Sequence, residues 1–179
     1  MSRRQGLLAG LLLVLAVVNG LVLQKELLLR EGTRLFLELA PVDPRSLIQG
    51  DYMRLDYALT RELQPPAPDW PRDGRLVVRT DERGVAGFVG RDQGQPLEGN
   101  QRFLRYRIRG GRMQLGAESF FFQEGQAELY QQARFAEFRV NPAGEVVLVG
   151  LRDEALQPLG KPGPGRSRGE TGGGERSHR

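Results

Sequence analysis

Residues 52–60 decide the fold of the main domain, and they read Tyr52-Met53-Arg54-Leu55-Asp56-Tyr57-Ala58-Leu59-Thr60. Apolar side chains recur at every second position, namely at Met53, Leu55, Tyr57 and Leu59. Because successive side chains of a strand point to opposite faces, this period of two predicts a β-strand with one buried face. Tyr52 then lies on the other face, where it can line a surface.

The segment before this strand, residues 41–51, reads as a turn that leads into it. Pro41 and Pro44 fix an extended connector, because a proline also keeps the preceding residue out of the helical region. Gly50 supplies a backbone conformation that other residues resist, and Asp51 can accept hydrogen bonds from nearby amides. The segment is therefore expected to shape the turn that leads into the strand. It is also a candidate binding surface, formed by Asp43, Pro44, Arg45, Gly50, Asp51, Tyr52, Leu55 and Tyr57.

The rest of the domain is predicted to be strands separated by turns. Further strands are expected at residues 33–39, 75–80, 85–90, 103–109, 112–115, 117–122, 136–140 and 145–151. Gly110-Gly111 predicts a two-residue hairpin, and residues 126–135 predict one short helix. Residues 30–157 are thus expected to form a mainly β (or α+β) domain, a small antiparallel barrel or sandwich with one short helix.

The N-terminal segment has the composition of a membrane span. Residues 6–23 carry no charge, and eighteen helical residues extend roughly 27 Å, close to the thickness of the hydrocarbon core. A cleaved signal peptide would have a shorter apolar core followed by a small-x-small site, and a buried helix would rarely be apolar on every face. We therefore predict a membrane anchor over residues 6–29, ended by Gly32.

The flanking charges predict the orientation of this span. Arg3 and Arg4 precede it, whereas Lys25 and Glu26 offset each other after it, so residues 1–5 are expected in the cytoplasm and the domain outside it. We expect a single-pass protein, because residues 24–179 include no second apolar stretch of spanning length. Residues 158–179, rich in Gly, Pro and charge, are expected to be a disordered tail.

The charge distribution argues against nucleic-acid binding. The formal net charge is +4, but residues 32–160 carry 17 arginines against 18 acidic residues. The positive excess therefore lies at the two ends, whereas a nucleic-acid-binding domain concentrates it on a folded face.

The sequence lacks the residues that several kinds of catalysis require. There is no cysteine, and the single histidine, His178, lies in the glycine-rich tail. A Ser-His or Cys-His pair and a His-ligated metal site each need a positioned imidazole. We therefore predict no catalytic residue, no metal site and no cofactor.

The spacing Gly50-Asp51-Tyr52-x-x-Leu55-x-Tyr57 resembles the signature of the GDYXXLXY family, bacterial membrane-anchored proteins of unknown function. The similarity extends to Phe120-Phe121-x-x-Glu124-Gly125 and to a final hairpin from Glu137 to Leu151, which adds Phe121, Glu124 and Gly125 to the candidate residues. The resemblance implies the bacterial inner membrane as location, with a periplasmic domain. It also implies a multi-spanning membrane protein as partner, and it supplies no catalytic residues.

Three functions remain open from the sequence. The first is a non-enzymatic accessory domain that contacts a membrane partner through residues 43–57. The second is a carboxylate-based hydrolase of envelope glycan that uses Asp43, Asp51 and Glu124, two of which would need a separation of roughly 5 to 9.5 Å. The third is a small-molecule-binding β-barrel lined by Tyr52, Trp70 and residues 120–122. Since alternate residues of a strand face opposite sides, the burial of Phe121 separates the third function from the first.

Overall fold

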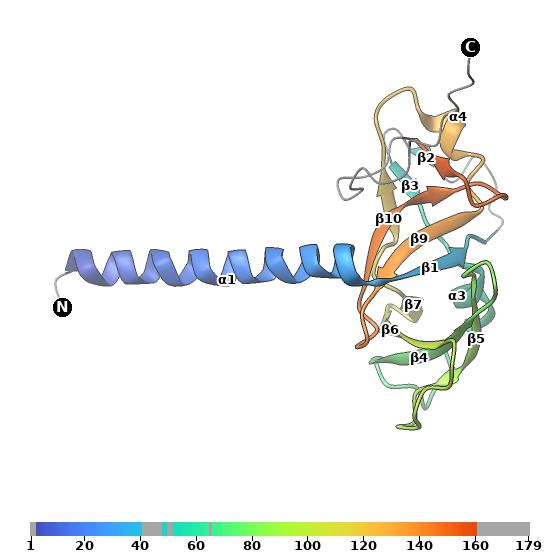
Figure 1. The fold of residues 1–179 in the computed structure, drawn as a ribbon, viewed down its shortest axis with the longest axis horizontal. Helices are drawn as coiled ribbons and strands as arrows, with labels where there is room; N and C mark the ends of the chain where they lie inside the picture. Colours follow the sequence, from blue (N-terminus) through green and yellow to red (C-terminus); the bar gives the residue numbers. More distant parts are fainter. Residues whose placement is uncertain (1–2, 41–47, 50–51, 65, 161–179) are drawn as a thin grey trace, which may run out of the picture.

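The computed structural model describes residues 3–40, 48–49, 52–64 and 66–160, and it consists of one long helix and a β-rich body. Helix α1 (Arg3–Glu31) stands away from the body, which is built from short antiparallel strands (Figure 1). Residues 7–31 are long and apolar enough to cross a membrane. Their most apolar stretch is not buried against the body, so α1 is not a core helix of this domain.

Helix α1 passes into strand β1 (Thr33–Glu38) through a single residue, Gly32. The Gly32 N–H donates to the Leu28 carbonyl (2.9 Å), and the Gly32 carbonyl accepts from the Arg139 guanidinium (3.2 Å). A side chain at Gly32 would collide with the Leu28 carbonyl and with Arg139, so this close packing requires glycine. Leu28 is buried as well, and the end of α1 is therefore packed onto the body.

The described residues of the body form three antiparallel sheets. The first has the order β1-β9-β10-β11, with β9 at Phe135–Val140, β10 at Val146–Arg152 and β11 at Pro158–Leu159. The second has the order β2-β3-β8, with β2 at Ile48–Gln49, β3 at Tyr52–Arg54 and β8 at Ser119–Phe121. The third has the order β5-β4-β6-β7, with β4 at Asp73–Thr80, β5 at Ala86–Arg91, β6 at Gln101–Arg109 and β7 at Arg112–Gln114.

The sheets curl around one core, as expected of a mainly β domain in barrel form. Isolated bridges join Phe36 to Val85 and Leu39 to Tyr57, so the first sheet contacts both others. The largest fully buried side chains come from the first and third sheets and from the segment after β7, and they include Phe138, Leu35, Leu37, Leu76, Leu104 and Leu115. The fold class predicted from the sequence is confirmed.

The predicted strand over residues 52–60 is wrong in its second half. Strand β3 ends at Arg54, and helix α3 (Ala58–Glu62), which the sequence did not predict, follows Tyr57. Leu59 in α3 and Leu63, the residue that follows the helix, are four positions apart, so both can pack on the core. The alternating burial of Met53, Leu55 and Tyr57 is nevertheless as predicted.

Other predicted elements differ at their ends. Helix α4 spans Ala127–Tyr130, shorter than the predicted 126–135, because the Arg134 N–H already donates to the Arg152 carbonyl of β10 (2.8 Å). Strand β11 pairs with Leu151 and Arg152, so the β structure runs past residue 157. The predicted tail beyond Gly160 lies outside the described residues. The Gly110-Gly111 hairpin is confirmed, since both residues take the positive φ (56° and 74°) of a type I′ turn.

An ion cluster lies within the first sheet. The Glu137 carboxylate on β9 accepts a hydrogen bond from Arg152 of β10 (Nε at 2.7 Å) and forms an ion pair with Arg34 of β1 (Nε at 3.1 Å). The turn between β4 and β5 packs on this face, since its Arg83 guanidinium lies 5.7 Å from the ring centroid of Phe135, two positions before Glu137 on β9. Glu137 is 1% exposed and Arg152 6%, so this ion pair is buried.

Replacing Glu137 should destabilise the domain strongly. Glu137→Ala leaves the buried Arg152 guanidinium without its carboxylate, and we expect the free energy of unfolding to fall by about 3 to 5 kcal/mol. Glu145→Ala is the control, because its ion pair with Arg105 is about half exposed and should contribute about 1 kcal/mol or less. Chemical unfolding in detergent measures both, and equal losses would contradict the buried role of Glu137.

Candidate functional site

The predicted site residues divide between described and undescribed parts of the chain. Asp43, Pro44, Arg45, Gly50 and Asp51 lie outside the described residues. The six others are described, and they come from β3, the segment after it, β8 and the turn before α4: Tyr52, Leu55, Tyr57, Phe121, Glu124 and Gly125.

Leu55 and Tyr57 are buried in the core, each 2% exposed. The Leu55 N–H donates to the Glu118 carbonyl (2.9 Å), and the Tyr57 hydroxyl donates to the Ala117 carbonyl. The Tyr57 ring packs edge-on against Phe138 of β9, with centroids 5.9 Å apart. Both side chains therefore hold the domain together and cannot contact a partner.

Burial changes the acid chemistry of Tyr57. Its pKa is raised well above the usual range of a tyrosine, first because the phenol is buried and then because of the negative charges of Glu118 and Asp56. The phenol therefore stays protonated and keeps its hydrogen bond to Ala117.

Tyr52 and Phe121 form an aromatic pair on the surface. They are direct partners in the pairing of β3 with β8, and their ring centroids are 5.8 Å apart. Phe121 is 74% exposed, a large fraction for a phenylalanine, and Tyr52 is half-buried. The pairing brings together two candidates that lie 69 positions apart in the sequence.

The neighbours of Phe121 point the other way. Phe120 and Phe122 both pack against the Tyr130 ring of α4, at centroid distances of 5.0 and 5.1 Å. Trp70 packs on Tyr106 (5.5 Å), so it folds back onto the third sheet. The aromatic residues proposed to line one pocket are thus spread between the core and the surface, and the position of Phe121 favours a contact surface.

Glu124 and Gly125 form a turn between β8 and α4. The Gln126 N–H donates to the Gln123 carbonyl (3.2 Å), and Gly125, the third residue of this turn, has a φ of 83°. This position favours glycine, as in a type II turn. Glu124 is exposed on the same turn, so this pair of residues shapes the connection between β8 and α4.

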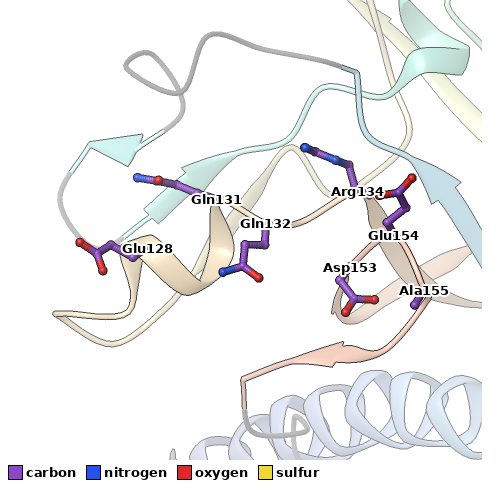
Figure 2. A pocket seen from close by; sticks show the side chains of 7 residues that line it. All are labelled: Glu128, Gln131, Gln132, Arg134, Asp153, Glu154 and Ala155. Carbon is purple, nitrogen blue, oxygen red and sulfur yellow. The ribbon is translucent and has the colours of Figure 1, made fainter.

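Two hollows lie among the described residues near these elements. The larger, about 770 Å³, is open and polar, and its lining side chains come from α4, from the segment between α4 and β9, and from the turn after β10 (Figure 2). Asp153 on its rim accepts from the Gln157 N–H (2.8 Å), so this carboxylate serves its own turn. The smaller, about 90 Å³, lies beside Leu55 and Tyr57. The described residues hold no group of three or more His, Cys, Asp or Glu side chains that could bind a metal ion.

The family model described as GDYXXLXY protein matches residues 14–151. The chain belongs to the GDYXXLXY family. The match begins within α1 and ends in β10, so in this GDYXXLXY protein it takes in the whole of β3 and β8. No curated protein and no solved structure matches the chain.

The stability of this GDYXXLXY protein should fall in alkaline solution. Burial raises the pKa of Tyr57, Tyr106 and Tyr130 above the value of about 10 of an unfolded chain. The unfolded state therefore loses protons first, and the free energy of unfolding decreases as the pH rises above about 10. Tyr57→Phe should lower stability near neutral pH by about 1 kcal/mol, because the Ala117 carbonyl loses its donor.

Thermal unfolding followed from about pH 8 to 11 measures this dependence. The Tyr57→Phe protein should show a shallower decline than the unmodified chain, because one of the three raised phenols is gone. Parallel declines would show that Tyr57 does not contribute to the pH dependence.

Proposed function

We propose that this GDYXXLXY protein is a membrane-anchored, non-enzymatic accessory domain whose Tyr52–Phe121 surface contacts a multi-spanning membrane protein of the bacterial envelope. The exposure of Phe121 carries the proposal. A phenylalanine that is 74% exposed beside a half-buried tyrosine has the chemistry of an interface anchor, since aromatic side chains dominate the binding energy of protein interfaces.

The sequence motif supports the same surface. Leu55 and Tyr57 fix β3 to the core, while Tyr52 on the same segment lies beside Phe121. A rigid strand that presents an aromatic pair loses little conformational entropy on binding, which favours a specific partner. The undescribed part of the motif, residues 41–47 and 50–51, adjoins β2 and β3 in the sequence.

The proposed location is the bacterial inner membrane, crossed once by α1, with residues 1–5 in the cytoplasm and the domain in the periplasm. The apolar stretch of α1 supports the crossing, and Arg3 and Arg4 support the orientation. Because Gly32 alone separates α1 from β1, the domain would lie directly at the membrane surface.

Truncating Phe121 should weaken the partner contact without unfolding the domain. We expect Phe121→Ala to reduce recovery of the membrane partner at least about tenfold, as for an aromatic interface anchor. Phe88→Ala is the matched control, since Phe88 lies partly exposed on β5 and outside the β2-β3-β8 sheet. Quantitative pull-down from detergent-solubilised membranes measures both. Equal recovery with the two variants, each with unchanged thermal unfolding, would refute the proposed surface.

The orientation can be tested separately. A reporter fused after Gly160 should be active as a periplasmic alkaline phosphatase and dark as a fluorescent protein that folds only in the cytoplasm. The fusion should also fractionate with membranes and retain its N-terminus in mass spectrometry. A soluble mature protein without its first thirty residues would show that α1 is a cleaved signal.

A further inference from the structure

The β6–β7 hairpin carries two arginines at its tip. Arg109 and Arg112 are partners across the Gly110-Gly111 turn, and both are exposed. Neither forms an ion pair with any residue in the described part of the chain. Like charges directly opposite each other on neighbouring strands destabilise the pairing. The tip therefore has two exposed guanidiniums that no carboxylate of the described chain binds as an ion pair.

These two arginines extend a basic face on the third sheet. Arg75 faces Arg105 across β4 and β6, and Arg107 lies two positions further along β6. Each of these three has a carboxylate partner: Asp92 for Arg75 (2.6 Å), Glu145 for Arg105 (3.0 Å) and Asp73 for Arg107 (2.6 Å).

Arg105, Arg107 and Arg109 of β6 all lie close enough to Asp73 to affect its carboxyl group. The hydrogen bond from Arg107 lowers the pKa of Asp73, and the charges of Arg105 and Arg109 lower it further. With Arg79, which lies on the same face at the far end of β4, six arginines accompany three carboxylates. At the end of the face nearest α1, the arginines without an ion pair are Arg109 and Arg112.

The described contacts show which way the hairpin points. Strand β6 begins at Gln101, which pairs with Arg79 just before the β4–β5 turn. That turn lies beside the end of the first sheet remote from α1, because Arg83 donates to the carbonyl of Glu154, which follows β10 (2.9 Å).

Further along β6, the chain reaches the end of the first sheet nearest α1. The Arg105 N–H donates to the Gly144 carbonyl (2.8 Å) in the β9–β10 turn. This turn follows Val140, the partner of Thr33, which is the second residue after α1. Strand β6 therefore runs toward the side where α1 enters, and Arg109 and Arg112 lie beyond Arg105 in that direction. Figure 1 shows β6 and β7 on this side of the body.

We infer that the Arg109–Arg112 tip of the β6–β7 hairpin binds the anionic phospholipid headgroups of the membrane that α1 crosses. The inference rests on the membrane crossing proposed above. Guanidinium groups bind phosphate oxygens through paired hydrogen bonds. Basic residues are attracted to an anionic leaflet within about a Debye length, roughly 10 Å at 0.1 M salt. The one-residue link at Gly32 keeps the domain close to that surface, so the bilayer is the polyanion nearest to the tip.

The test uses the full chain in lipid nanodiscs that contain either phosphatidylcholine alone or phosphatidylcholine with phosphatidylglycerol. Since the sequence has no cysteine, Ala143→Cys in the exposed β9–β10 turn gives a single site for a fluorophore. A headgroup-linked quencher reports the distance from this site to the bilayer surface. We expect quenching at least about twofold stronger in the anionic discs, and this difference should vanish near 1 M salt, where the Debye length is about 3 Å.

Two double variants separate the tip from general charge. Arg109→Gln with Arg112→Gln should abolish the difference between the two discs. Arg79→Gln with Arg134→Gln removes the same charge from exposed positions at the end remote from α1, and it should leave the difference intact. Equal quenching in both discs, or equal effects of the two double variants, would overturn the inference.

Two further outcomes have distinct meanings. A chain that does not co-elute with either disc would refute the membrane crossing, independently of the hairpin. If the chain shows equal quenching in both discs and binds soluble inorganic polyphosphate through Arg109 and Arg112, the occupant is a soluble polyanion and the lipid assignment is wrong.

Discussion

Tyr57 joins the first and second sheets of the domain. Its backbone bridges to Leu39 next to β1, its ring packs against Phe138 of β9, and its hydroxyl donates to the Ala117 carbonyl ahead of β8. The burial that makes this hydrogen bond strong also raises the pKa of the phenol and keeps the donor in place. The last tyrosine of the family signature thus acts within the core, and its position fixes where β3 and β8 lie.

The same short segment also carries the surface. Alternation along β3 sends Met53 inward and leaves Tyr52 beside Phe121, so one sequence motif contains both the anchor and the proposed contact. The alternation of side chains along β3 therefore both anchors the strand in the core and places the aromatic pair on the surface. The arginine tip is a separate feature, since it belongs to the third sheet and lies outside the motif.

Local sequence patterns predicted the strands and turns well, because alternation and paired glycines act over a few residues. They failed where contacts with a distant part of the chain determine the local structure. Leu59 fits both a strand with a period of two and the first turn of a helix. Its packing on the core together with Leu63 favours the helix, α3. Glu137 has the pattern of an outward residue, yet it is buried, and the β4–β5 turn, more than fifty positions earlier, packs on the same face of the sheet.

The candidate site shows the same limit on what local patterns reveal. The run of residues 120–122 indicated that one or two phenylalanines face away from the core, but only the pairing of β8 with β3 and the packing of α4 select Phe121. Likewise, the spacing of arginines on β6 is visible in the sequence, whereas their place beside the α1 junction depends on the Arg105–Gly144 hydrogen bond.

The packed junction at Gly32 has a geometric consequence. Because the junction has no hinge, α1 and the β domain rotate together about the helix axis. The rotation of α1 therefore sets the direction in which the Tyr52–Phe121 surface faces. Each residue added to a helix rotates the rest of the chain by about 100° and lifts it by about 1.5 Å. A single insertion in α1 would therefore swing the aromatic surface to another side while leaving every contact inside the domain unchanged.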